Sequence, residues 1–175
     1  MATIMYGKPV AEEILATVRK DVSALRTRGI TPRLDVVLVG NSPASQRYVG
    51  KKIEKCRELG MHGELHTFDE AVSAQELRDR VQRLSDNADV HAVLVQLPLP
   101  GHIEEPGEGF DKFDVFDAVK GEKDVDGISR YTVPELYRAK EDRMLHLPAT
   151  ALAVRRVLDF YGVETEARVA VIVGR

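Results

Sequence analysis

Apolar residues along the chain fall into stretches with helical spacing and stretches with strand spacing. Helical spacing predicts amphipathic helices over 9–29, 44–60 and 150–162, each of which ends at or next to a glycine. A further helix is expected after Ser73, because Glu76 three residues later completes a capping box ahead of an apolar stripe. Each stripe marks a helix face that is to be buried against a core.

Three β-branched runs predict strands between these helices. The runs are RLDVVLVG at 33–40, HGELHTF at 62–68 and VHAVLVQL at 90–97. The third run is almost unbroken hydrophobic sequence, as in a strand that is covered on both faces of a parallel sheet. Because strands alternate with helices, the predicted fold class is α/β, a three-layer, mainly parallel sheet with helices on both faces.

The segment between 101 and 126 is acidic and rich in glycine, which predicts a loop-rich excursion from the sheet. A short helix is expected around 113–119, and the excursion returns the motif KDVDG at 123–127 toward the sheet. The last residues, RVAVIVGR at 168–175, form another strand-like run, which a loop and a helix would normally follow. We therefore expect one α/β domain and the start of a second that is cut short.

Charge and composition narrow the classes of function. The net charge is -3 and the pI is near 6.0, so no diffuse basic surface is available for a phosphate backbone, and Trp is absent. We expect no nucleic-acid partner. The N-terminus lacks an apolar leader, and no run approaches the roughly 18 apolar residues that cross a bilayer, so we expect a cytoplasmic location without membrane contact.

Cysteine and histidine usage argues against disulfides and metals. Cys56 is the single cysteine, which excludes an intrachain disulfide and a zinc site made of thiolates, and fits a reducing compartment. The five histidines show no His-Glu-x-x-His arrangement, and His62 and His66 lie on a predicted strand. No metal site is expected.

Tyr48 and Lys52 are four residues apart on the second predicted helix, so their side chains share one face. In a cleft a lysine loses solvation, its pKa falls toward neutrality, and it can act as an acid or a base. Spacing alone also fits a solvated lysine on a basic helix. The Tyr-x-x-x-Lys pair of short-chain dehydrogenases is a further alternative, but no glycine-rich dinucleotide loop precedes residue 48.

Gln96 ends the buried strand, at the edge where open α/β sheets bind ligands. An amide in such an apolar stretch costs on the order of 1 to 3 kcal/mol unless it finds partners. Gln96 is therefore either a residue already in solvent or a group of a functional site.

Asp124 and Asp126 flank Val125, so in an extended segment only one of the two carboxylates can enter a pocket. A carboxylate can bind two neighbouring N–H donors, such as those of a guanidinium group or an aminopyrimidinone edge. An Asx-turn and a calcium-tolerant acidic loop are the alternatives.

Four segments together resemble methylenetetrahydrofolate dehydrogenase/methenyltetrahydrofolate cyclohydrolase, the bifunctional folate enzyme. They are SQRYVGKKIEKCRELGM at 45–61, VQLPLPGHI at 95–103, EKDVDGI at 122–128 and LPATALAVRRVLDFYGV at 147–163. The resemblance covers essentially the whole chain. It implies a folate-binding catalytic domain over 1–147, a linking helix over 148–162 and the first strand of a truncated Rossmann domain over 163–175.

The resemblance also implies an activity and its site residues. The activity is NADP-dependent oxidation of 5,10-methylenetetrahydrofolate and hydrolysis of the methenyl product to 10-formyltetrahydrofolate. Lys52 would be the general acid/base, with Gln96 bonded to it and Tyr48 stacking on the folate; Asp126 would hold the pterin N–H edge, with Ser45 in support. NADP, or NAD, would be bound by Gly174 and Arg175 and mainly by residues beyond 175, in an enzyme that is a homodimer at full length.

The chain departs from the family pattern at several positions. Ala149, Ala151 and Ala153 replace cysteine, proline and glycine at the helix entry, and Thr132 and Pro134 replace asparagine and glycine after KDVDG. These departures keep two alternatives open: a folate-binding paralogue that is inactive or limited to one step, and an unrelated α/β metabolite-binding domain.

Overall fold

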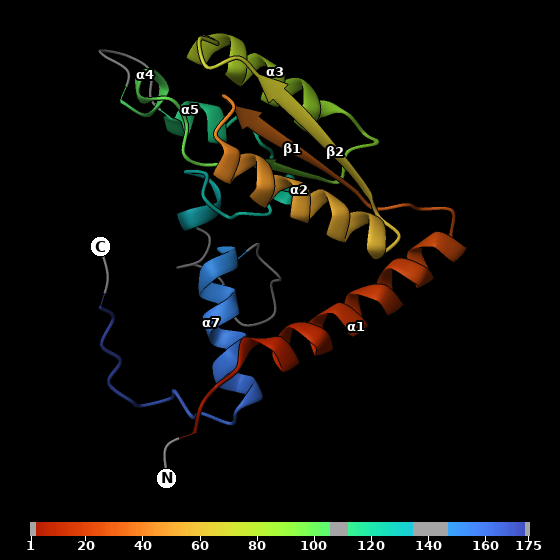
Figure 1. Ribbon diagram of the computed structural model, residues 1–175, viewed down its shortest axis with the longest axis vertical. Coiled ribbons are helices and arrows are strands. Elements are labelled where there is room, and N and C mark those ends of the chain that lie inside the picture. The colour runs from red at the N-terminus through yellow and green to blue at the C-terminus, as the bar shows by residue number, and fades with distance from the viewer. Residues whose placement is uncertain (1–2, 106–111, 135–146, 174–175) are drawn as a thin grey trace.

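The computed structural model describes residues 3–105, 112–134 and 147–173. Within these ranges a parallel three-stranded sheet has the order β2–β1–β3, formed by β1 (Arg33–Val39), β2 (His62–Phe68) and β3 (Ala92–Val95). Helices α2 (Pro43–Glu58) and α3 (Ala74–Asp86) lie on opposite sides of the sheet (Figure 1). The predicted α/β class, with helices on both faces of a parallel sheet, is confirmed.

The central strand β1 connects two separate hydrophobic layers. Alternate side chains of a strand point to opposite faces. Val36 packs under α2 with Val49 and Ile53, whereas Val37 faces α3 and packs with Leu77 in the larger cluster. Burial on both faces explains why β1 reads as a continuous apolar run.

The remaining described elements lie beside this three-layer core. Helices α1 (Gly7–Thr27) and α7 (Ala149–Phe160) pack against each other on the far side of α2 from the sheet, and α5 (Lys112–Phe116) packs on α3 (Figure 1). Short helical turns α4 (Gly101–Glu104) and η1 (Gly121–Lys123) belong to the predicted excursion. The helix expected around 113–119 is thus present but ends at Phe116.

Helix α2 is terminated by Gly60, two residues after its last helical residue. Gly60 has a φ of 80°, a left-handed conformation that L side chains rarely adopt. Its N–H donates to the Arg57 carbonyl at 3.0 Å, and the N–H of Met61 donates to the Cys56 carbonyl at 2.9 Å. These two carbonyls, which have no partner further along the helix, are thereby hydrogen-bonded. Helix α7 ends in the same way at Gly162, as the sequence predicts.

Helix α2 also lies unusually close to β2, at Gly63. A Cβ atom on residue 63 would lie 3.1 Å from the Cβ of Cys56 and 3.3 Å from the Cδ1 of Ile53, both on α2. These distances are shorter than ordinary carbon–carbon contacts. The missing side chain at position 63 therefore sets how closely α2 approaches the sheet.

Two predicted strands differ from the structure. The strand β3 covers only 92–95 of the predicted 90–97, although His91 and Gln96 still donate backbone hydrogen bonds to β1. The described residues 163–173 form no strand, and Val169 and Ile172 are each 94% exposed. Strand propensity becomes a strand only beside a hydrogen-bonding neighbour, and within the described ranges none lies next to this segment.

Candidate active site

Helix α2 carries the first two candidate residues. Its buried stripe of Val49, Ile53 and Cys56 anchors the helix to the sheet and leaves Tyr48 and Lys52 at the rim. The Nζ of Lys52 lies 4.6 Å from the centre of the Tyr48 ring, within range of a cation–π contact. The Tyr48 side chain is nevertheless 59% exposed, so much of the ring remains available to a ligand.

Gln96 meets Lys52 at the end of β3. The Lys52 ammonium donates a hydrogen bond of 3.1 Å to Oε1 of Gln96, and the Gln96 Nε2 donates to the carbonyl of Leu97 at 2.7 Å. The Gln96 backbone N–H donates to Val37 at 2.8 Å, which ties the residue to the sheet. Both ends of the Gln96 side-chain amide therefore have hydrogen-bond partners, as an amide beside an apolar strand requires.

The surroundings of Lys52 make its ammonium form less favourable. Burial lowers the pKa of Lys52, and the negative charge of Asp126 opposes this effect without cancelling it. Lys52 is therefore closer to a neutral amine than an exposed lysine is. A neutral amine can still donate one N–H to Gln96 while its lone pair is free to accept a proton.

Asp126 completes the group from a distant loop. It is partly buried, and burial raises the pKa of its carboxyl; the charge of Lys52 lowers that pKa, and the charge of Asp124 raises it. A parallel bridge between Val93 and Asp124 brings the loop to β3. Lys52 and Asp126 therefore influence each other's protonation, although they belong to segments far apart in the sequence.

Asp124 forms the Asx-turn that the sequence analysis gave as an alternative for an aspartate of this motif. It is fully enclosed, and its Oδ1 accepts a hydrogen bond of 3.0 Å from the N–H of Gly127. The Asx-type turn thus applies to Asp124, and Asp126 remains as the carboxylate at the site.

The other predicted site residues are placed as follows. Ser45 lies in the first turn of α2, less than one turn before Tyr48, and is partly buried. Gly174 and Arg175, expected to touch a dinucleotide, lie outside the described residues. Four predicted residues are therefore near one another, since Ser45 and Tyr48 share the helix of Lys52 and Gln96 bonds to it.

Lys52, Gln96, Tyr48 and Asp126 together form a combination suited to a planar, polar substrate. The exposed ring of Tyr48 offers a stacking surface, and Asp126 offers an acceptor for neighbouring N–H groups. Lys52 offers a proton acceptor that Gln96 orients. This set can bind a heterocycle and move a proton at its edge.

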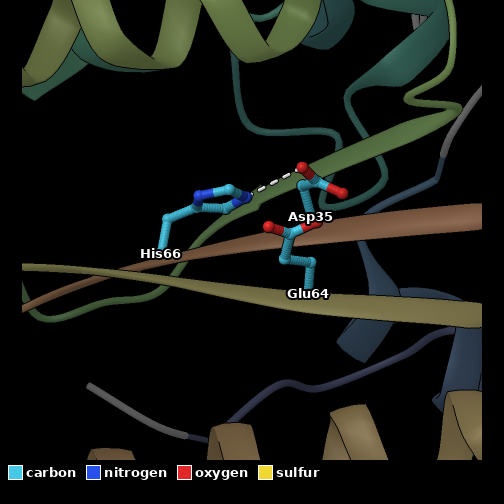
Figure 2. A group of neighbouring side chains, drawn as sticks. All are labelled: Asp35, Glu64 and His66. Atoms are coloured by element: carbon cyan, nitrogen blue, oxygen red, sulfur yellow. Dashed lines mark hydrogen bonds and ion pairs between the residues drawn. The ribbon is translucent and has the colours of Figure 1, made fainter.

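A second polar group was not anticipated from the sequence. Asp35, Glu64 and His66 lie together on the α3 side of β1 and β2, and their ligand atoms are all within 4.8 Å of one another (Figure 2). The Nε2 of His66 is 2.8 Å from the fully buried Asp35 carboxylate. A group of this composition is one that could hold a metal ion.

Arg33 already supplies the positive charge in this group. Its guanidinium donates to both oxygens of Asp35, at 2.7 and 2.9 Å, and to Glu64 at 2.6 Å. Burial raises the pKa of Asp35, but the hydrogen bonds and charges of Arg33 and His66 outweigh it and hold that pKa below its usual value. The available signal was an aspartate inside an apolar strand, two residues after an arginine on the same face.

A cavity lies away from these polar groups. It occupies about 600 Å³ between α1 and α7 and is lined mainly by apolar side chains such as Val10, Ile14 and Leu152. Its lining contains none of the paired acid–base groups described above. Among the described helices, none combines the length and the apolar character needed to cross a membrane.

Comparisons with known proteins identify relatives of this chain. A family model described as the catalytic domain of tetrahydrofolate dehydrogenase/cyclohydrolase matches residues 5–126. The bifunctional protein FolD of Moorella thermoacetica is 40% identical over 174 residues, which cover 99% of this chain and 59% of that protein. FolD of Lysinibacillus sphaericus is 38% identical over 174 residues, with 99% and 58% covered. The chain thus spans less than two thirds of the length of these relatives.

Solved structures agree with the sequence comparisons. The bifunctional FolD methylenetetrahydrofolate dehydrogenase/cyclohydrolase of Campylobacter jejuni superposes with a TM-score of 0.83 at 32% identity, covering 92% of this chain and 54% of that one. FolD of Trypanosoma brucei, solved in complex with NADP and an inhibitor, gives a TM-score of 0.81 at 30% identity, with 93% and 53% covered.

Proposed function

The chain belongs to the tetrahydrofolate dehydrogenase/cyclohydrolase catalytic-domain family, and we propose that it is the folate-binding catalytic part of a one-carbon folate enzyme. The proposed activity is NADP-dependent oxidation of 5,10-methylenetetrahydrofolate to the methenyl compound and hydrolysis of that compound to 10-formyltetrahydrofolate. The observation that carries this proposal is the partly buried Lys52, bonded to Gln96 beside the exposed ring of Tyr48.

In the proposed hydrolysis Lys52 moves the proton. The methenyl substrate is itself a cation, so its approach further disfavours the protonated form of Lys52 and makes a neutral base available. Lys52 accepts a proton from the attacking water as its oxygen bonds to the methenyl carbon. It then returns this proton to N5 of the folate as the bond between that nitrogen and the carbon breaks, and the remaining hydroxyl proton passes to solvent as the formyl C=O forms.

The neighbouring residues hold the substrate for this step. Tyr48 stacks on the planar folate, and Asp126 accepts hydrogen bonds from the N–H edge of the pterin. Gln96 keeps one N–H of Lys52 engaged, which fixes the direction of the lone pair. Ser45 supports the site from the start of α2.

In the proposed oxidation a hydride leaves the methylene carbon for the nicotinamide ring, and the contribution of this chain is to orient the folate. Gly174 and Arg175 would contact the cofactor, with most contacts made by residues beyond 175. Both residues lie outside the described ranges. The choice of NADP is supported by the Trypanosoma brucei relative, which was solved with that cofactor.

The proposal also includes a cytoplasmic location, a homodimer for the full-length enzyme and no nucleic-acid partner. The single cysteine supports the cytoplasmic location. The net charge of -3 supports the absence of a nucleic-acid partner. The dimer rests on family resemblance, and sedimentation of the full-length protein measures it directly.

The test compares Lys52→Met with Lys51→Met, which removes an exposed lysine from the neighbouring position on the same helix. Methenyltetrahydrofolate hydrolysis is followed by the loss of methenyl absorbance, and binding of a folate analogue by calorimetry. Lys52→Met should lower turnover by about 100-fold or more and change binding by less than about tenfold. Lys51→Met should behave as the unmodified protein.

Each other outcome identifies an alternative. An unmodified protein that binds the analogue without turnover would be a folate-binding paralogue, which the altered residues at 149–153 make worth considering. A protein that binds no folate analogue would contradict the proposed function, although the chain belongs to the family. Loss of binding in Lys52→Met, with turnover intact at saturation, would show that Lys52 holds substrate and does not transfer protons.

A further inference from the structure

A buried polar network lies directly behind Asp126. The Asp124 side chain is only 4% exposed, and three donors satisfy its carboxylate. Oδ1 accepts from the N–H of Gly127 at 3.0 Å. Oδ2 accepts from the N–H of Ser129 at 3.1 Å and from the hydroxyl of Thr132 at 2.8 Å.

Charge fixes the direction of every hydrogen bond in this network. An ionised carboxylate can only accept, so the single hydroxyl proton of Thr132 points to Asp124. The 2.9 Å contact between the Ser129 and Thr132 hydroxyls must then be donated by Ser129. The Ser129 oxygen in turn accepts from the Thr132 N–H at 3.2 Å. Both hydroxyls are buried, and each has a donor role and an acceptor role.

The network fixes the backbone both before and after Asp126. On one side, Asp124 forms the bridge to Val93 of β3. On the other, Gly127 donates its N–H to Asp124 and has a left-handed φ of 63°. Asp126 lies between these two fixed points, so its backbone has little freedom to rotate.

A second anchor reaches the same segment from the preceding residue. The ammonium group of Lys123 donates to the carbonyls of Ser85 at 2.8 Å and Asn87 at 2.7 Å, at the end of α3. Lys123 thus attaches the chain to α3 just before Asp124. After Asp124, the chain turns back and donates hydrogen bonds to the Asp124 carboxylate. The Thr132 hydroxyl is the last of these donors along the chain, and it joins the end of this turn to its beginning.

We propose that Asp124, Ser129 and Thr132 are positioning residues that hold the Asp126 carboxylate where it can accept from the substrate N–H edge and act on Lys52 through its charge. This inference rests on the proposed folate-binding function. It assigns a role to Thr132, where the family pattern has asparagine: the hydroxyl at this position supplies the donor that Asp124 requires. The charge of Asp124 additionally raises the pKa of Asp126, which gives the network an electrostatic readout.

The test removes one hydroxyl and keeps the shape. Thr132→Val deletes the donor to Asp124, and Thr132→Ser is the matched control that retains it. Affinity for a folate analogue should fall about tenfold in Thr132→Val, because a hydrogen bond to a buried carboxylate is lost. Turnover at saturating substrate should stay within about threefold, and Thr132→Ser should restore affinity.

A double-mutant cycle with Asp126→Asn separates positioning from general stability. If Thr132 acts through Asp126, Thr132→Val should have no further effect on affinity once residue 126 is asparagine. An undiminished effect in that background, or a lower melting temperature with unchanged affinity, would overturn the proposal. Should Thr132→Val fail to fold, Ser129→Ala is measured in the same cycle.

A readout without folate keeps this inference separate from the proposed function. NMR titration of the Asp126 carboxyl should give a different pKa in Thr132→Val and an unchanged one in Thr132→Ser. If the unmodified protein binds no folate analogue, the proposed function fails, while this titration still decides whether the network positions Asp126. An Asp126 titration identical in all three proteins would refute the positioning role.

Discussion

The ammonium nitrogen of Lys52 and the amide oxygen of Gln96 are 3.1 Å apart, although 44 residues separate them in the chain. This contact connects the middle of α2 to the residue that directly follows β3. Gln96 is itself held by its backbone bond to Val37 and by its side-chain bond to Leu97. Lys52 is consequently attached to the central strand of the sheet through Gln96.

Gln96→Glu should make hydrolysis more dependent on high pH. A carboxylate in contact with Lys52 favours the ammonium form and raises its pKa, so less neutral base is present near pH 7. The acid limb of the pH profile of kcat/KM should move to higher pH, and the rate at neutral pH should fall about tenfold or more. Gln46→Glu, at an exposed position of α2, is the control, and an unshifted profile in Gln96→Glu would contradict the role of Gln96.

Asp126→Asn should shift the same acid limb in the opposite direction. The charge of Asp126 raises the pKa of Lys52, so its removal lets that pKa fall further and keeps the base neutral at lower pH. Folate affinity should decrease at the same time, because a carboxylate acceptor is lost. Asp79→Asn on the surface of α3 is expected to change neither quantity, and an acid limb that does not move in Asp126→Asn would show that the two groups are not coupled.

Substitution of Tyr48 distinguishes stacking from proton donation. Tyr48→Phe keeps the ring and should retain hydrolysis and folate affinity within about threefold, whereas Tyr48→Leu should weaken affinity about tenfold or more, since base–aromatic stacking contributes roughly 1 to 3 kcal/mol. Calorimetry and steady-state rates provide both values. Inactivity of Tyr48→Phe would instead support a tyrosine that donates a proton, as in short-chain dehydrogenases.

Arg33→Met should destabilise the fold without touching the acid–base site. Asp35 is fully buried, and loss of its principal positive partner should lower the free energy of unfolding by about 3 kcal/mol. Urea unfolding at neutral pH measures this change. Arg80→Met, at an exposed position of α3, is the control, and folate affinity should be unchanged in both variants.

Acid unfolding of the same variant tests the sign of the Asp35 contribution. The pKa of Asp35 is depressed in the folded state, so the stability that it provides is present above its unfolded pKa and is lost as the pH falls through the folded pKa. Without Arg33, burial dominates and that pKa rises. The midpoint of acid unfolding should therefore occur at a higher pH in Arg33→Met, and an equal midpoint would show that His66 alone compensates the carboxylate.

Local spacing was enough to predict which elements carry the site but not how they meet. The four-residue interval between Tyr48 and Lys52 fixes their common helix face wherever the helix lies. Their approach to Gln96 depends instead on how α2 sits over β1 and β3, which is decided by long-range packing. The family resemblance named the same residues, whereas spacing alone also allowed a solvated lysine.

The polar group around Asp35 shows where sequence patterns are insufficient. Its members come from two strands, and they meet only because the parallel register pairs Asp35 with Glu64. A shift of one residue would place Glu64 on the other face of the sheet. No local pattern specifies that register. The segment at 163–173 shows the converse, because high strand propensity gave no strand where a pairing partner was missing from the described ranges.

Gly63, which lacks a side chain, influences the position of the Lys52 amine through the helix that carries Lys52. Because α2 rests on that residue through Cys56 and Ile53, one added methyl group would act as a wedge under the helix that carries Lys52. The absence of a side chain at position 63 thus helps to set how far Lys52, beside Ile53, extends over the end of β3.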